Sequence, residues 1–113
     1  MAGFQTHDGA ARDELRPLRV ALRREELFAE ARTMVEDLAD WRLVRADDAK
    51  LELHCERKGG LLSSTARVTI RVDGPEGLPS STLTVSSESS GGLLARDKSV
   101  VLEFLTPFRR RVG

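Results

Sequence analysis

The chain has 113 residues, of which 40% are apolar and 32% are charged, with 18 basic and 18 acidic side chains. This length and apolar content are typical of one globular domain with a single modest core, and they argue against a disordered chain. A formal net charge of zero gives no general attraction to nucleic acid or to anionic lipid, so we expect no nucleic-acid partner and no membrane partner.

The sequence also argues against a protein held together by disulfides or zinc and against one that spans a membrane. Cys55 is the one cysteine, so no intramolecular disulfide can form, and no cluster of cysteine and histidine residues offers the ligands of a structural zinc site. The chain has no run of roughly 18 apolar residues, and residues 1–10 do not have the pattern of a secretory signal. We therefore expect a cytoplasmic protein in a reducing compartment, with no metal and no cofactor.

Residues 1–15 mix small and polar side chains around Phe4, which leaves little to hold this segment against a core. We therefore expect a flexible N-terminal tail over residues 1–15 and a single α+β domain over residues 16–113. The domain begins with residues 17–22, where Leu18, Val20 and Leu22 alternate with polar or small residues. This alternation, after a leading proline, predicts a short strand at a sheet edge.

Residues 24–38 change to a helical period. The apolar positions of this stretch recur on one face of a helix, and they are Leu27, Phe28, Ala31, Met34, Val35 and Leu38. A second amphipathic helix is predicted over residues 95–111. Because Pro107 lacks a backbone donor and crowds the preceding turn, we expect a kink or an early end of this helix near Leu105 or Thr106.

Four stretches between the two helices alternate apolar with polar residues, at 41–46, 50–58, 66–72 and 82–88. Short connections rich in turn formers join them, which favours an antiparallel meander with one wet face. The order β-α-β-β-β-β-α predicts a two-layer α+β sandwich with both helices on one face of the antiparallel sheet. At the level of fold alone, this order is similar to a helix-grip or TATA-box-binding-protein-like arrangement.

The polar face of this sheet is the candidate binding surface. Strict alternation places six charged or hydroxyl side chains of two successive strands on that face. These candidate residues are Glu52, His54, Glu56, Arg67, Thr69 and Arg71. The alternative is that opposite charges only pair across neighbouring strands in solvent, each pair adding ~0.2–1 kcal/mol.

No catalytic constellation is recognisable. Successive side chains on one face of a strand are about 6.5 Å apart, so Glu52, His54 and Glu56 do not easily share a metal ion. Cys55 points away from His54, which excludes a nucleophile and base made of these two neighbours. An enzymatic interpretation would use Glu52, His54 and Glu56 as acid and base, with Arg67 or Arg71 as an anion clamp, but we expect a protein that is not an enzyme.

The C-terminal third carries a family resemblance. In the stretch Ser87-Glu88-Ser89-Ser90-Gly91-Gly92-Leu93-Leu94-Ala95-Arg96-Asp97-Lys98-Ser99-Val100-Val101-Leu102-Glu103-Phe104-Leu105, a serine-rich strand end, a glycine, a short polar step and a closing helix follow one another. Together with Trp41 after the first helix, it resembles the bacterial domain of unknown function family numbered 1499, over roughly residues 17–112. The resemblance implies a helix-and-sheet fold and no defined activity.

The sequence thus predicts a non-enzymatic protein-binding or assembly module. The polar face, or the edge formed by the short first strand, would meet a protein partner or a second copy of the chain. The alternative is a small apolar ligand held between the sheet and the helices. The side chains that would line such a cavity are Phe28, Met34, Leu53, Val68, Ile70, Val85 and Phe104.

Overall fold

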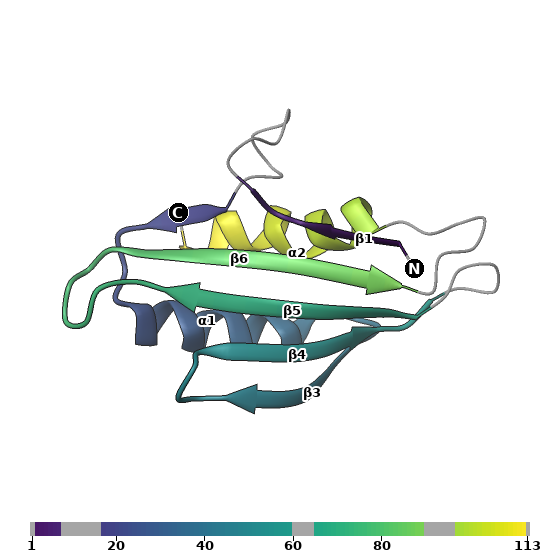
Figure 1. Ribbon diagram of the computed structural model, residues 1–113, viewed down its shortest axis with the longest axis horizontal. Helices are drawn as coiled ribbons and strands as arrows, with labels where there is room; N and C mark the ends of the chain where they lie inside the picture. The colour runs from purple at the N-terminus through teal and green to yellow at the C-terminus, as the bar shows by residue number, and fades with distance from the viewer. Residues whose placement is uncertain (1, 8–16, 60–64, 90–96, 113) are drawn as a thin grey trace.

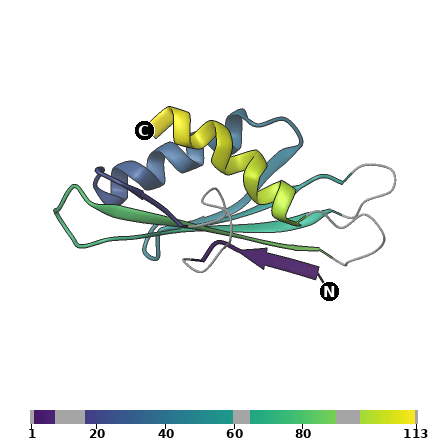
Figure 2. The ribbon, with the colours of Figure 1, turned by 90° about the horizontal axis from the view of Figure 1, so that it is seen from above.

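The computed structural model describes residues 2–7, 17–59, 65–89 and 97–112. They form an antiparallel sheet with two helices on one of its faces (Figures 1 and 2), which confirms the predicted two-layer α+β sandwich. The strands are β1 (Ala2–Gln5), β2 (Leu18–Val20), β3 (Trp41–Asp47), β4 (Glu52–Arg57), β5 (Ala66–Asp73) and β6 (Ser81–Ser89). The helices are α1 (Arg24–Asp37) and α2 (Asp97–Val112).

Strands β3 to β6 follow one another as an antiparallel meander, as the short connections predicted. Both β1 and β2 pair with the outer side of β6, one after the other along its length. Among the described strands, β3 therefore forms one edge of the sheet, and β1 and β2 together form the other. The short strand expected at an edge does lie there.

The N-terminal segment differs from the predicted loose tail, because residues 2–5 form β1 beside β6 (Figure 1). The next residue, Thr6, is 2% exposed. Its N–H donates to the carbonyl of Val85 over 2.9 Å, and its Oγ1 accepts the N–H of Val85 over 3.0 Å. Hydrogen bonds to β6 therefore hold this segment in place, although it has few large apolar side chains. The rest of the predicted tail, residues 8–16, lies outside the described residues.

The core lies between the sheet and the helices. Both helices bury an apolar face, with Leu27 and Phe104 completely inaccessible to solvent. The aromatic rings of Phe104 and Phe108 are 4.9 Å apart, and Trp41 lies 5.9 Å from Phe104. The strands contribute the inward half of their alternating residues, which are Leu53, Cys55, Ala66, Val68, Ile70, Val72, Leu83 and Val85.

Helix α2 continues past Pro107 to Val112, so of the two expected outcomes, a kink or an early end, the early end is wrong. A proline inside a helix costs about 3 kcal/mol or more. Against this cost, Phe108 directly after the proline is fully buried, which is worth roughly 1.5–3 kcal/mol. One turn later, Arg111 donates to Asp37 at the end of α1 over 2.8 Å. These two contacts hold the last turns of α2 against α1.

Candidate binding surface on the open sheet face

The six candidate residues lie together on the face of the sheet that faces away from the helices. Strands β4 and β5 pair so that Glu52 is opposite Arg71, His54 is opposite Thr69 and Glu56 is opposite Arg67. Figure 2 shows both helices on the other side of the sheet. The alternation in the sequence therefore predicted that these side chains share the face that points away from the helices.

Residues of β6 and β3 extend these pairs into three rows across four strands. The first row is Asp47, Glu52, Arg71 and Thr84; the second is Arg45, His54, Thr69 and Ser86; the third is Arg42, Glu56, Arg67 and Glu88. We call these twelve residues the polar face. Its flanking rows carry most of the charge, and its middle row carries two hydroxyls and the histidine.

A β-bulge at Val44 decides which residue of β3 stands opposite His54. Leu43 pairs with Cys55 on the core side, and the register then shifts so that Arg45, rather than Val44, pairs with His54. Val44 is the extra residue, and it is 53% exposed. We did not expect a functional role for Arg45 from the sequence. The signal was the pair Leu43-Val44, where two successive apolar residues break the alternation.

A shallow depression of about 270 Å³ lies in the polar face. Side chains of the middle and third rows border it, together with the bulged Val44. The polar-face residues along its rim are His54, Glu56, Arg67, Thr69, Ser86 and Glu88. Its volume is at the lower limit of pockets that enclose small molecules, about 300 Å³, so its shape suits a side chain of a partner better than a whole ligand.

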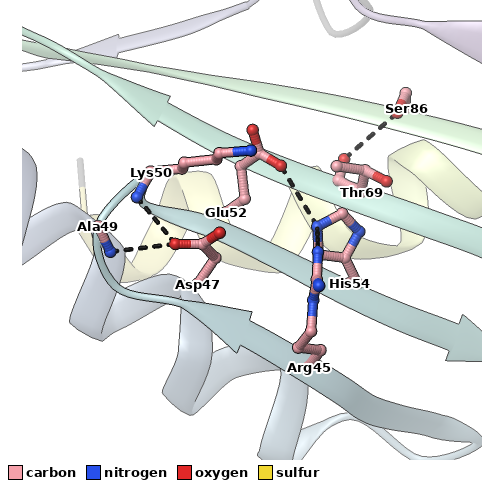
Figure 3. A network of polar contacts seen from close by, with 8 residues as sticks. All are labelled: Arg45, Asp47, Ala49, Lys50, Glu52, His54, Thr69 and Ser86. Atoms are coloured by element: carbon pink, nitrogen blue, oxygen red, sulfur yellow. Dashed lines mark hydrogen bonds and ion pairs between the residues drawn. The ribbon is translucent and has the colours of Figure 1, made fainter.

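Most carboxylates of the polar face already have a partner, since Glu52 lies 3.3 Å from the imidazole of His54. Glu56 forms an ion pair with Arg42, and Arg71 pairs with Asp73 over 3.2 Å. Asp47 accepts the backbone N–H groups of residues 49 and 50 over 3.1 and 3.0 Å, which closes the turn into β4 (Figure 3). The exposed Glu88 is the carboxylate of the polar face that forms no ion pair with any residue that the structure describes.

Among the arginines of the polar face, Arg67 is the one without a side-chain partner in the part of the chain that the structure describes. Glu56 and Glu88 stand opposite it on the two neighbouring strands, yet Arg67 forms no ion pair with any residue that the structure describes. Its side chain is exposed at the depression. A guanidinium group with five donors therefore remains available on this face.

His54 lies at the centre of a small polar network (Figure 3). Its Nε2 is 3.3 Å from Oε1 of Glu52 and 3.3 Å from Nη2 of Arg45. Across the sheet, Ser86 donates weakly to the carbonyl of Thr69 over 3.5 Å. The bulge of β3 brings Arg45 into this network.

The geometry offers no support for the enzymatic interpretation. Cys55 is 3% exposed on the core side of the sheet, and its burial raises the pKa of the thiol to about 12. It is therefore a neutral thiol at physiological pH and lies on the opposite side of the sheet from His54. Among the described residues, no three potential ligands lie close enough to hold a metal ion. No described helix is long and apolar enough to cross a membrane.

Comparisons with known proteins add little. No family model matches the chain, and no curated protein matches it. Among solved structures, the chain is similar to one titled "Crystal structure of Ara h 8.0201", with 7% identity, a TM-score of 0.46, and coverage of 96% of this chain and 98% of that chain. The resemblance to the family numbered 1499 stays a prediction.

Proposed function

We propose that this domain is a non-enzymatic protein-binding module, and that its polar face binds a partner segment carrying carboxylate side chains. The observation that carries the proposal is Arg67. Its guanidinium is exposed at a depression of the polar face and has no ion-pair partner among the described residues.

The surroundings of Arg67 suit an acidic partner. A guanidinium presents a planar fork of donors that matches a carboxylate in a bidentate manner. Thr69 and Ser86 place hydroxyl groups at the same depression, where they can donate to the partner or accept from its backbone. The exposed Val44 offers apolar area beside these polar groups. The combination of an arginine anchor with polar and apolar contacts is common in protein interfaces.

A partner other than a second copy fits the charges best. For self-association through this face, one copy would have to supply carboxylates to Arg67 of the other. Glu56 is engaged by Arg42, and Asp47 is engaged by the turn that follows it. Glu52 contacts His54, so each copy could offer only Glu88 without breaking an existing contact of the described residues. A different partner with its own acidic residues does not have to break these contacts.

The apolar-ligand alternative finds less support in the packing. Leu53, Ile70, Val85 and Phe104, which would line the ligand cavity, have no exposed surface, and they contact other core side chains. Protein interiors packed in this way leave few voids larger than a water molecule. A ligand would have to displace these side chains, which favours the open face as the binding surface.

A selection from a random peptide display library tests the proposal. We expect the selected peptides to be enriched in Asp and Glu. The substitution Arg67→Ala should weaken their binding about tenfold, because it removes the anchoring guanidinium. The matched control is Arg32→Ala, which removes an exposed arginine of α1 on the helical side and should leave binding unchanged. The proposal would be contradicted by selected peptides that are not enriched in Asp and Glu, or by an affinity that Arg67→Ala leaves unchanged.

A further inference from the structure

One imidazole nitrogen has two incompatible neighbours. Nε2 of His54 lies 3.3 Å from Nη2 of Arg45 and 3.3 Å from Oε1 of Glu52 (Figure 3). A guanidinium can only donate hydrogen bonds, and an ionised carboxylate can only accept them. The nitrogen can therefore satisfy Arg45 only without a proton, and Glu52 only with one.

We propose that His54 makes binding at the polar face depend on pH, by retaining Arg45 when neutral and releasing it toward the acidic partner when protonated. This inference rests on the proposed function, since Arg45 would be a second cation for the same carboxylate-bearing segment. Histidine is the side chain whose ordinary range of protonation falls between about pH 5 and 8.

The two states follow from the contacts. In the neutral state the proton resides on Nδ1, the lone pair of Nε2 accepts from Arg45, and the guanidinium stays over β4. In the protonated state Nε2–H donates to Glu52, and the imidazolium repels Arg45. Because Arg45 follows the exposed Val44 on the edge strand, a released guanidinium has solvent around it and the depression beside it.

Other charged groups near His54 do not offset this exchange. On β3, Asp47 is held by its turn, and Arg42 pairs with Glu56 of β4. On β5, residues 67 and 71 are arginines in the flanking rows, and the residue directly opposite His54 is Thr69. On β6, Ser86 continues the middle row, and Glu88 lies in the third row. Among the described carboxylates, Glu52 is therefore the one in contact with the imidazole.

Nitrogen NMR of the imidazole tests the switch without any ligand. We expect the Nδ1–H tautomer at about pH 8, since Nε2 must then accept from Arg45. The guanidinium resonances of Arg45 should shift with the titration of His54. The variant His7→Gln, which removes the other histidine, should show the same behaviour. The Nε2–H tautomer at this pH, or Arg45 resonances that do not follow the titration, would overturn the inference.

Affinity measurements then test the consequence. The probe is a fluorescent peptide of alternating Asp and Ser, blocked at both ends, whose carboxylates stay ionised at about pH 5.5. We expect about two- to fivefold tighter binding at this pH than at about pH 7.5, the size of one exposed ion pair, and no such change in His54→Gln. Equal binding at both pH values would overturn the switch and leave the proposed function standing. No binding at either pH would overturn the proposed function, and the regulation with it.

Discussion

The indole N–H of Trp41 donates to Oε1 of Glu103 over 2.6 Å, and this contact joins the edge strand β3 to helix α2. The same carboxylate accepts from Nη2 of Arg57 over 2.9 Å and from Nε of Arg57 over 3.2 Å. Glu103 thus ties α2 to both β3 and β4 at the boundary of the core. Trp41 follows the first helix closely in the sequence, yet its indole is bonded to the second helix.

Removal of this carboxylate should destabilise the fold. We expect Glu103→Ala to lower the free energy of unfolding by about 2 kcal/mol, because the indole and the guanidinium both lose their acceptor. Glu103→Gln keeps an acceptor for the indole and should lower it by about 1 kcal/mol. Urea unfolding followed by the fluorescence of Trp41, the one tryptophan, measures both values. An effect of Glu103→Ala no larger than that of the exposed control Glu36→Ala would contradict this account.

The N-terminal strand should contribute measurably to stability through Thr6. The substitution Thr6→Val leaves the buried N–H of Val85 without the hydroxyl acceptor, which should cost about 1–3 kcal/mol. Thr6→Ser keeps the hydroxyl and should cost less. Hydrogen exchange of the Val85 amide should quicken in Thr6→Val only. Equal stability of the two variants would show that this segment is not held by the hydrogen bond described.

Stability should decline at alkaline pH because of Cys55. Its pKa is raised by burial to about 12 in the folded chain, while an unfolded thiol titrates near 8.5. Between these values the unfolded state has lost a proton that the folded state keeps. The free energy of unfolding therefore falls as pH rises above about 8.5, and the thiol has no such effect below it. Urea unfolding at about pH 7 and pH 10 should show a larger decline in the wild-type chain than in Cys55→Val, and equal declines would contradict the assignment.

Deletion of Val44 should preserve the fold and alter association. Because Val44 is the extra residue of the bulge, its loss leaves Leu43 opposite Cys55 and Arg45 opposite His54. A bulge on an edge strand hinders pairing with other strands. We therefore expect the deletion variant to fold, with its mass in light scattering increasing more steeply with concentration than that of the wild-type chain. Unfolding of the variant would show that the register does not survive the deletion.

The sequence predicted most of the elements because their periods are set by the pleat and by the helical turn. The same pleat placed Glu52, His54 and Arg67 on one face. Residues 2–5 were missed as a strand, because β6 supplies the hydrogen bonds that hold them. An early end of α2 near Pro107 was wrongly expected as one alternative, because burial of Phe108 and the Arg111 ion pair depend on tertiary contacts.

The network around His54 could not be predicted from the sequence, for a related reason. Alternation gives the face of each side chain, but the register between strands decides which side chains meet. The bulge in β3 shifts that register by one residue and brings Arg45 to His54. Register likewise decides that Glu56 meets Arg42 of β3, with which it forms an ion pair, as well as Arg67 of β5.

The most direct test of the central claim is an amide NMR titration with the blocked Asp-Ser peptide. The account predicts shifts confined to the polar face, centred on Arg67, Thr69 and Ser86 and extending to Val44, while the amides of α1 and α2 stay unmoved. Shifts centred on the helices, or no shifts at millimolar peptide, would contradict the claim that the open sheet face binds an acidic partner.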